Sequence, residues 1–169
     1  MRHSVAVLTA AFLFAALPLG ARHDDRSGPA FYKVEFTVHD GSIFAHQGDS
    51  HYTMMVDESR PGLLQALTRV PPEAGATVSV IAEVGAKIEC SVHDASGMAA
   101  LEGSLNISSL SGFVNLASLS EPIIAERKVS FKAVLTPGVS TMVIDIPSPS
   151  NPTITLADFQ VHATVTKLP

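Results

Sequence analysis

The sequence predicts an all-β fold, an antiparallel sandwich or barrel-like domain of about seven to eight strands that follows an N-terminal signal peptide. Apolar and polar residues alternate along most segments, as they do in strands with one buried face. Clusters of Gly, Pro, Asp and Ser separate these segments, and no long stretch has the spacing of an amphipathic helix.

Residues 1–21 have the features of a secretory signal peptide. Residues 5–19 are apolar apart from Thr9 and Pro18, and this run is shorter than the roughly 20 residues that a membrane-spanning helix needs. Pro18 and Gly20 break the helix, and Ala21 offers a small residue for cleavage. We therefore expect an exported protein, periplasmic or extracellular, with no membrane span in the mature chain.

Cleavage after Ala21 leaves residues 22–169, a length of 148 residues (169 minus 21) that suits a single β domain. We expect residues 22–29 to be disordered. The loss of Arg2 leaves ten basic against sixteen acidic side chains, a formal charge of −6 without a basic stripe. Nucleic acid is therefore not an expected partner.

The first two expected strands are residues 31–39 and 51–57. Their inward-facing residues share an even position in the sequence: Tyr32, Val34, Phe36 and Val38, then Tyr52, Met54 and Val56. Residues 59–70 are ambiguous, because Ser59 and Pro61 suit a helix start while Thr68 to Val70 before Pro71 suit an extended chain. We favour a loop followed by a strand in this segment.

Residues 77–93 form the longest alternating run and predict one long strand, in which every even position is small or apolar. Gly85, near its middle, marks a bulge or a close approach of another backbone. Cys90 is the only cysteine of the chain and lies on the apolar side. We expect it to be a buried, unreactive thiol that forms no disulfide.

Four further strands are expected at residues 98–110, 123–135, 141–146 and 159–168, and each again alternates apolar with polar positions. Their expected inward-facing residues are Ala99, Leu101, Gly103, Leu105 and Ile107; Ile123, Ala125, Val129, Phe131, Ala133 and Leu135; Met142, Ile144 and Ile146; and Phe159, Val161, Ala163 and Val165.

Two His-Asp pairs, His39-Asp40 and His93-Asp94, raise the question of acid–base chemistry. Adjacent strand residues point to opposite faces, so the two side chains of a pair do not converge on one substrate or ion. Asp40 precedes Gly41, and Asp94 stands three residues before Gly97. We interpret both pairs as strand ends that enter turns.

The segment from His39 to His51 contains the candidate metal ligands His39, His46, Asp49 and His51, together with Asp40. Neutral imidazoles and a carboxylate could hold zinc or copper. The spacings, however, match no zinc signature and no calcium loop. A solvated polar loop without a cofactor is the favoured interpretation, and a metal site is the alternative.

Arg127 shares its parity with Ala125 and Val129 and is therefore placed on an otherwise apolar face. A buried guanidinium must be paired, so one interpretation is a buried ion pair. The other places Arg127 at a bulge, facing water. Three carboxylates could supply the partner of a buried pair: Glu83, Glu89 or Asp145.

Three stretches, EVGAKIECSV (83–92), ALEGSLNISSL (100–110) and PIIAERKVSFKAVLTPGVSTMVIDI (122–146), follow an order of features that resembles the C-terminal β-domain segment of bacterial secretins. Secretins are the outer-membrane gates of secretion systems. The positions that match the pattern of that family are Val84, Gly85, Leu105, Ile107, Ser109, Pro122 and Arg127, while Ser130 or Phe131 stands where Thr is expected.

The resemblance covers residues 78–146 and has two departures. The apolar strand ends in DIPSPS where the family has paired glycines, and the chain has no room for the N-terminal ring domains of the family. The resemblance therefore implies a related, stand-alone β-fold and not a gated pore. Nearly the whole mature chain is also similar to short exported bacterial proteins without an assigned activity.

These observations predict an exported, non-enzymatic β-domain of the bacterial cell envelope, which acts as a binding or structural module through sheet edges or loops. A cell-envelope protein is its expected partner. No Gly-x-Ser-x-Gly motif supports hydrolysis. The alternatives are a metal-binding periplasmic protein that uses the 39–51 loop, a secretin-like oligomer or secretion-system accessory, and a hydrolase assembled from residues distant in sequence.

Overall fold

The computed structural model describes residues 28–41, 49–70, 77–78, 82–116, 119–147 and 158–169. The predicted signal peptide lies outside these ranges. Every regular element in them is a strand, which confirms the all-β prediction. The strands are β1 (Phe31–Asp40), β2 (Asp49–Asp57), β3 (Gly62–Arg69), β4 (Thr77–Val78), β5 (Glu83–Ala95), β6 (Met98–Leu116), β7 (Leu119–Leu135), β8 (Thr141–Ile146) and β9 (Phe159–Lys167).

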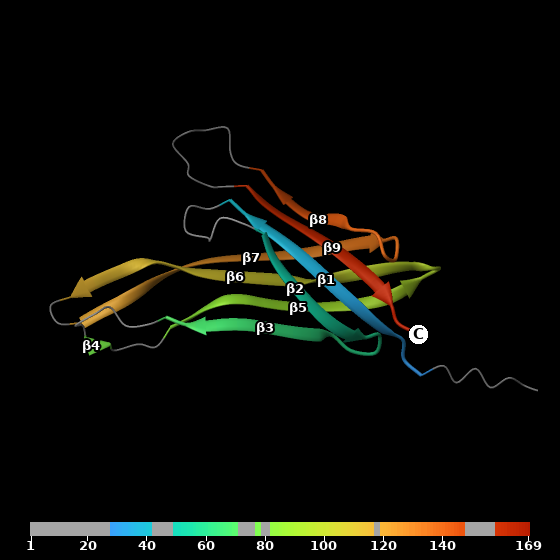
Figure 1. The fold of residues 1–169 in the computed structure, drawn as a ribbon, viewed down its shortest axis with the longest axis horizontal. Coiled ribbons are helices and arrows are strands. Elements are labelled where there is room, and N and C mark those ends of the chain that lie inside the picture. The colour runs from blue at the N-terminus through green and yellow to red at the C-terminus, as the bar shows by residue number, and fades with distance from the viewer. Residues whose placement is uncertain (1–27, 42–48, 71–76, 79–81, 117–118, 148–157) are drawn as a thin grey trace, which may run out of the picture.

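The strands form two separate sheets, and the fold is therefore sandwich-like. Sheet A has the order β2-β1-β9-β8, and sheet B has the order β3-β5-β6-β7-β4. All neighbours pair antiparallel except the two-residue β4, which runs parallel to β7. Sheet A crosses over part of the longer sheet B, so one end of the long β6–β7 hairpin extends beyond it (Figure 1). Among the described residues there is no helix with the length and hydropathy of a membrane span.

The core lies between the sheets and is built by the predicted alternation. In β1 from Tyr32 to Val38 and in β9 from Phe159 to Val165, every second residue is at most 2% exposed. Sheet B supplies the opposite side of the core, with Ile88, Val92, Leu101, Leu105 and Leu135 all nearly inaccessible. The rings of Phe36 and Phe131 meet across the sheets with their centroids 5.7 Å apart.

Cys90 is buried in this core, as predicted, with its Sγ 3.6 Å from Sδ of Met54. Burial raises the pKa of the Cys90 thiol to about 12, since the thiolate would have no water around it. The thiol therefore stays protonated at neutral pH and is a packing group.

The predicted single strand at residues 77–93 is wrong. Residues 77–78 form β4 at the β7 edge of sheet B, whereas β5 lies between β3 and β6. Alternation predicts which face of a strand a residue occupies, but not which strand lies beside it. Two separate strands whose apolar residues both fall on even positions therefore look like one strand in the sequence. The favoured strand within residues 59–70 is confirmed as β3.

Four residues that were expected to face the core are exposed instead. Ile123 is 45% exposed and Ala125 is also exposed, because that part of β7 extends beyond sheet A. Met142 and Ile146 are 47% and 41% exposed. A register shift between Met142 and Ile144 places Met142 beside His162 on the outer face, and strict alternation cannot anticipate such a bulge. Ile146 keeps the inward register opposite Phe159, but it is the last residue of the edge strand β8.

Candidate functional site

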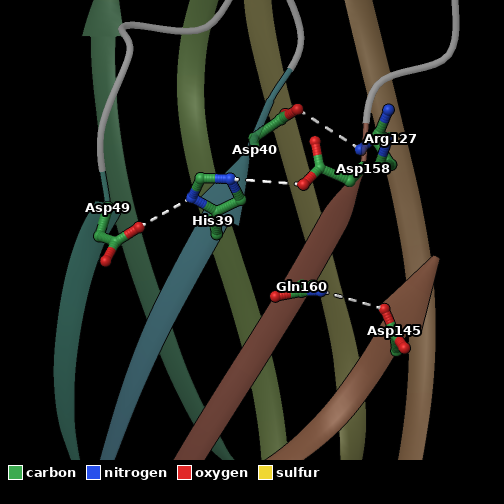
Figure 2. A network of polar contacts seen from close by, with 7 residues as sticks. All are labelled: His39, Asp40, Asp49, Arg127, Asp145, Asp158 and Gln160. Carbon is green, nitrogen blue, oxygen red and sulfur yellow. Dashed lines mark hydrogen bonds and ion pairs between the residues drawn. The ribbon is translucent and has the colours of Figure 1, made fainter. Parts of the chain in front are cut away.

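A polar cluster lies at one end of the sandwich, where β1 ends, β2 begins and β9 begins, opposite the middle of β7 (Figure 2). Its members are His39, Asp40, Asp49, Arg127 and Asp158. Antiparallel pairing sets these residues side by side, because His39 faces Asp49 across β1 and β2 and Asp40 faces Phe159 across β1 and β9.

Arg127 and Asp40 join the two sheets. Arg127 lies opposite Ile107 on the inner side of sheet B, and its Nη1 is 3.4 Å from Oδ1 of Asp40 on sheet A. The two side chains are only 23% and 16% exposed. The guanidinium carbon also lies 4.6 Å from the centroid of the buried Phe159 ring, a cation–π contact. The pair is therefore a partly buried tie between the sheets.

The sequence suggested different partners for Arg127. Glu83 lies instead 3.7 Å from the exposed Arg69, Glu89 is exposed, and Asp145 accepts a hydrogen bond from Gln160. The parity of β7 predicts the face that Arg127 occupies. It carries no information on which residue of the opposing sheet lies across from it.

Arg127→Ala is expected to lower the free energy of unfolding by about 1–3 kcal/mol, because Asp40 would lose its cationic partner while remaining largely enclosed. Urea denaturation of wild type, the Arg127→Ala variant, the Asp40→Asn variant and the double variant gives the coupling between the two residues. Arg69→Ala is the matched control, since Arg69 is 77% exposed and its pair with Glu83 lies at the surface. An Arg127→Ala variant as stable as wild type would exclude the tie.

His39 is held between two carboxylates. Its Nδ1 is 2.9 Å from Oδ1 of Asp49, and its Nε2 is 3.6 Å from Oδ2 of Asp158. A neutral imidazole has one N–H, whereas the imidazolium can present a proton to both carboxylates. The hydrogen bond to Asp49, helped by the nearby charges of Asp158 and Asp40, raises the pKa of His39 above its usual value of 6.5. This arrangement favours the cation.

A second contact ties the same strand ends. The Gly41 amide donates a hydrogen bond of 3.0 Å to the Asp158 carbonyl oxygen. A Cβ at position 41 would lie 2.1 Å from Oδ1 of Asp158, so only glycine allows this approach without a shift of that side chain. The end of β1 is therefore fixed against the residue that precedes β9.

His39→Gln is expected to lower the melting temperature at acidic pH and to have progressively less effect as the pH rises. A group whose folded pKa is raised stabilises the folded state fully below its unfolded pKa, here about 6.5, and this stabilisation is lost as the pH passes the folded pKa. Thermal unfolding of both proteins between about pH 5 and pH 9 measures the difference. A difference that is constant over this range would contradict a protonated His39.

The structure brings together two of the four predicted metal ligands, His39 and Asp49. His51 lies elsewhere on β2 and its Nδ1 is 3.1 Å from Oγ1 of Thr37, while His46 lies outside the described residues. Within the described ranges, no three His, Cys, Asp or Glu side chains have the arrangement of a metal site. Metal binding by the 39–51 segment stays a prediction.

The second His-Asp pair occupies a strand end, as expected. Asp94 accepts a 3.1 Å hydrogen bond from the Gly97 amide, and Ser96 and Gly97 have φ values of 57° and 85°, which suit a two-residue hairpin turn. The bond from Gly97, followed by contacts with Lys167, lowers the pKa of Asp94. Nζ of Lys167 is 3.1 Å from Oδ2 of Asp94, which ties sheet A to sheet B at this end.

Asp40 ends β1, which is the strand end expected from the sequence, and the expected turn after Gly41 lies outside the described residues. Asp40 is paired with Phe159, and its side chain turns toward Arg127. Sequence reasoning missed Asp158 and Lys167, which contact His39 and Asp94, and it placed Phe159 in the core without its contact to Arg127. They come from the far end of the chain, and no local motif connects them with β1 or β5.

No protein-family model matches this chain. No curated protein matches it either. Solved structures do match in fold. The type II secretion system secretin GspD of E. coli K12 has 11% sequence identity and a TM-score of 0.55, over 83% of this chain and 50% of that chain.

A second similar structure is the Klebsiella pneumoniae type II secretion system outer membrane complex, with PulD, PulS and the PulC HR domain. It has 10% identity and a TM-score of 0.54, over 84% of this chain and 41% of the matched chain. The chain thus spans half or less of the lengths of these two structures. At such identities the likeness concerns the fold, and it extends well beyond the residues 78–146 that carried the resemblance in the sequence. The chain has a secretin-like β-domain fold.

Proposed function

We propose that this protein is an exported, non-enzymatic β-domain of the bacterial cell envelope that acts as a binding or structural module. The observation that carries the proposal is that charged side chains of this protein form contacts between its own strands and sheets. Arg127 with Asp40, and Lys167 with Asp94, connect the two sheets, while His39 connects the ends of three strand segments. We expect these contacts to hold the two sheets in a fixed arrangement, and loops and edges that bind a partner are positioned best by a rigid scaffold.

The contact surfaces of such a module are its sheet edges and loops. β2 and β8 are the outermost strands of sheet A, and β3 is the outermost long strand of sheet B. Edge strands have backbone donors and acceptors on one side that are available to an added strand. Recognition by strand addition needs no chemical turnover, which agrees with a role as a module.

The fold likeness supports an envelope location. The two similar structures are described as a type II secretion system secretin and an outer membrane complex of the same system. A signal peptide at residues 1–21 would bring this chain to the same compartment. The likeness also favours a second candidate function, a secretin-like oligomer or a secretion-system accessory. Mass measurements in solution and in detergent separate the two, because a ring must be multimeric.

Site-specific photo-crosslinking in exporting cells tests the module proposal. The crosslinker is placed at Thr53 in β2, Leu63 in β3 and Asp145 in β8, with Glu102 and Ser104 on β6, which is paired on both sides, as controls. We expect an adduct of discrete mass, in the envelope fraction, from at least one edge position and none from the controls. If no edge position gives an adduct, or if the protein stays in the cytoplasm, the proposal fails.

A further inference from the structure

One edge of sheet B is formed by β3, which pairs with β5 on one side over Gly62–Arg69 without a register shift. Leu63 and Leu67 lie on the same face of this strand and are 58% and 44% exposed. The strand contains no proline, and its one charged residue is Arg69 at its end. Edge strands that avoid association usually have charges, prolines, bulges or short lengths, and β3 lacks these features along most of its length.

The other edges are better protected. β8 has six residues and a bulge between Met142 and Ile144. At the opposite edge of sheet B, β4 pairs with β7 only at Leu119 and Ser120, and the rest of β7 contains Pro122 and charged residues, among them Glu126, Lys128 and Lys132. β2 begins and ends with an aspartate and exposes mostly polar side chains along its first half. β3 is therefore the edge in the described part of the chain that is best prepared to accept another strand.

The sequence of β3 is complementary to itself. In an antiparallel pair, facing residues lie on the same side of the sheet. In a joined sheet the core-facing sides of both copies lie on the same side. Two copies of β3 related by a twofold axis can therefore pair only in registers in which odd-numbered residues face odd-numbered residues. In the register centred on Gln65, Leu63 of each copy faces Leu67 of the other, and Leu64 faces Ala66.

The neighbouring allowed registers lack this match. A twofold axis at Ala66 would set Leu63 against Arg69, and an axis at Leu64 would set Leu67 against Pro61. Only the axis at Gln65 places both exposed leucines against leucines. Apolar cross-strand pairs each contribute about 0.2–1 kcal/mol, so this register is the one that the edge favours.

We propose that two copies of this chain associate through antiparallel pairing of β3 with β3 about a twofold axis at Gln65, which joins the two B sheets into one continuous sheet. The contact is isologous and closes with two copies. The proposal deepens the module function, on which it rests, by naming the partner of one sheet edge. The paired segments, residues 62–68 of each copy, are short, so we expect a concentration-dependent dimer with micromolar affinity.

Sedimentation and mass measurements of the purified protein over a range of concentrations test the proposal with a charge exchange. The L63K/L67K variant places like charges opposite each other in both leucine pairs and is expected to be monomeric. The L63K/L67E variant places opposite charges there and is expected to recover the dimer in a salt-sensitive form. Circular dichroism and thermal unfolding show whether each variant remains folded.

Val134→Lys is the matched control, because Val134 is 61% exposed on β7, away from the β3 edge. It is expected to leave the dimer intact. The proposal is overturned if wild type is monomeric at several hundred micromolar, about a hundredfold above the expected affinity. It is also overturned if wild type forms a larger ring, if the L63K/L67K variant still dimerises, or if the L63K/L67E variant does not recover the dimer.

The failure of this dimer is distinguishable from the failure of the module function. If the crosslinker at Leu63 gives no adduct with the mass of a dimer, the β3 pairing is excluded. Adducts from Thr53 or Asp145 with a different envelope protein would still support the module. An adduct from Leu63 with another protein, combined with a monomer in solution, would replace the second copy by that partner.

Discussion

Replacing Phe159 with alanine is expected to lower the free energy of unfolding by about 3–5 kcal/mol, the usual cost of removing a buried aromatic ring. Phe159 is inaccessible to solvent, is the first residue of β9 and lies opposite Asp40 on β1. Its ring also lies below the Arg127 guanidinium, at 4.6 Å from the centroid. Its removal would therefore open a cavity and would also remove the ring that packs against the Arg127 guanidinium. Urea denaturation followed by circular dichroism measures the loss.

Phe31→Ala is the control for this experiment. Phe31 is the first residue of β1 and is 49% exposed, so its truncation should change the free energy of unfolding by no more than about 1 kcal/mol. If Phe159→Ala and Phe31→Ala have equal effects, Phe159 is not part of the core. A Phe159→Leu variant should recover much of the stability but not the cation–π contact. The loss of stability caused by Phe159→Leu should therefore be smaller in an Arg127→Ala background than in the wild-type background.

Replacing Gly85 with alanine is expected to destabilise the protein by about 3 kcal/mol, the second largest effect. A Cβ at this position would lie 2.0 Å from the carbonyl oxygen of Ala66 on β3. The obstacle is backbone of the paired strand, so relief requires β3 to move away from β5. The φ of 140° at Gly85 adds a cost for any residue with a Cβ. Hydrogen exchange of the β3 amides should accelerate together with the loss of stability.

Gly112→Ala separates the two causes. Gly112 has a φ of 156°, close to that of Gly85, but a Cβ at position 112 meets nothing within 4 Å. We expect this variant to lose about 1 kcal/mol at most and to leave hydrogen exchange in β3 unchanged. Equal losses at the two positions would mean that backbone conformation, and not the approach of β3, requires glycine at position 85.

The sequence predicts correctly which side chains of a strand are buried wherever the opposite sheet covers that strand. Val34 and Val161 are buried at the positions that alternation predicts. The same pattern misplaces Ile123, because the sequence does not reveal where sheet A stops covering sheet B. Met142 is misplaced for a different reason, a one-residue bulge between Met142 and Ile144 that places Met142 on the outer face.

The polar cluster could be predicted only in part. The alternation in residues 123–135 predicts that Arg127 faces the core, and the glycine after His39-Asp40 predicts that a strand ends there. That Asp40 is the partner of Arg127, and that His39 lies between Asp49 and Asp158, depends on pairings between segments far apart in the chain. A single sequence contains local periodicity and no measure of distance between its segments.

The sequence by itself determined that this chain is an all-β protein, which residues of most strands face inward, and that Cys90 is a packing group. These properties follow from the transfer of alternating apolar side chains out of water, which is local and has a period of two residues. Only the tertiary structure decided the strand order, the tie between Arg127 and Asp40, and the open edge of β3. Those properties depend on which strands lie side by side, and hydrogen bonds between backbones join any two strands with nearly equal ease.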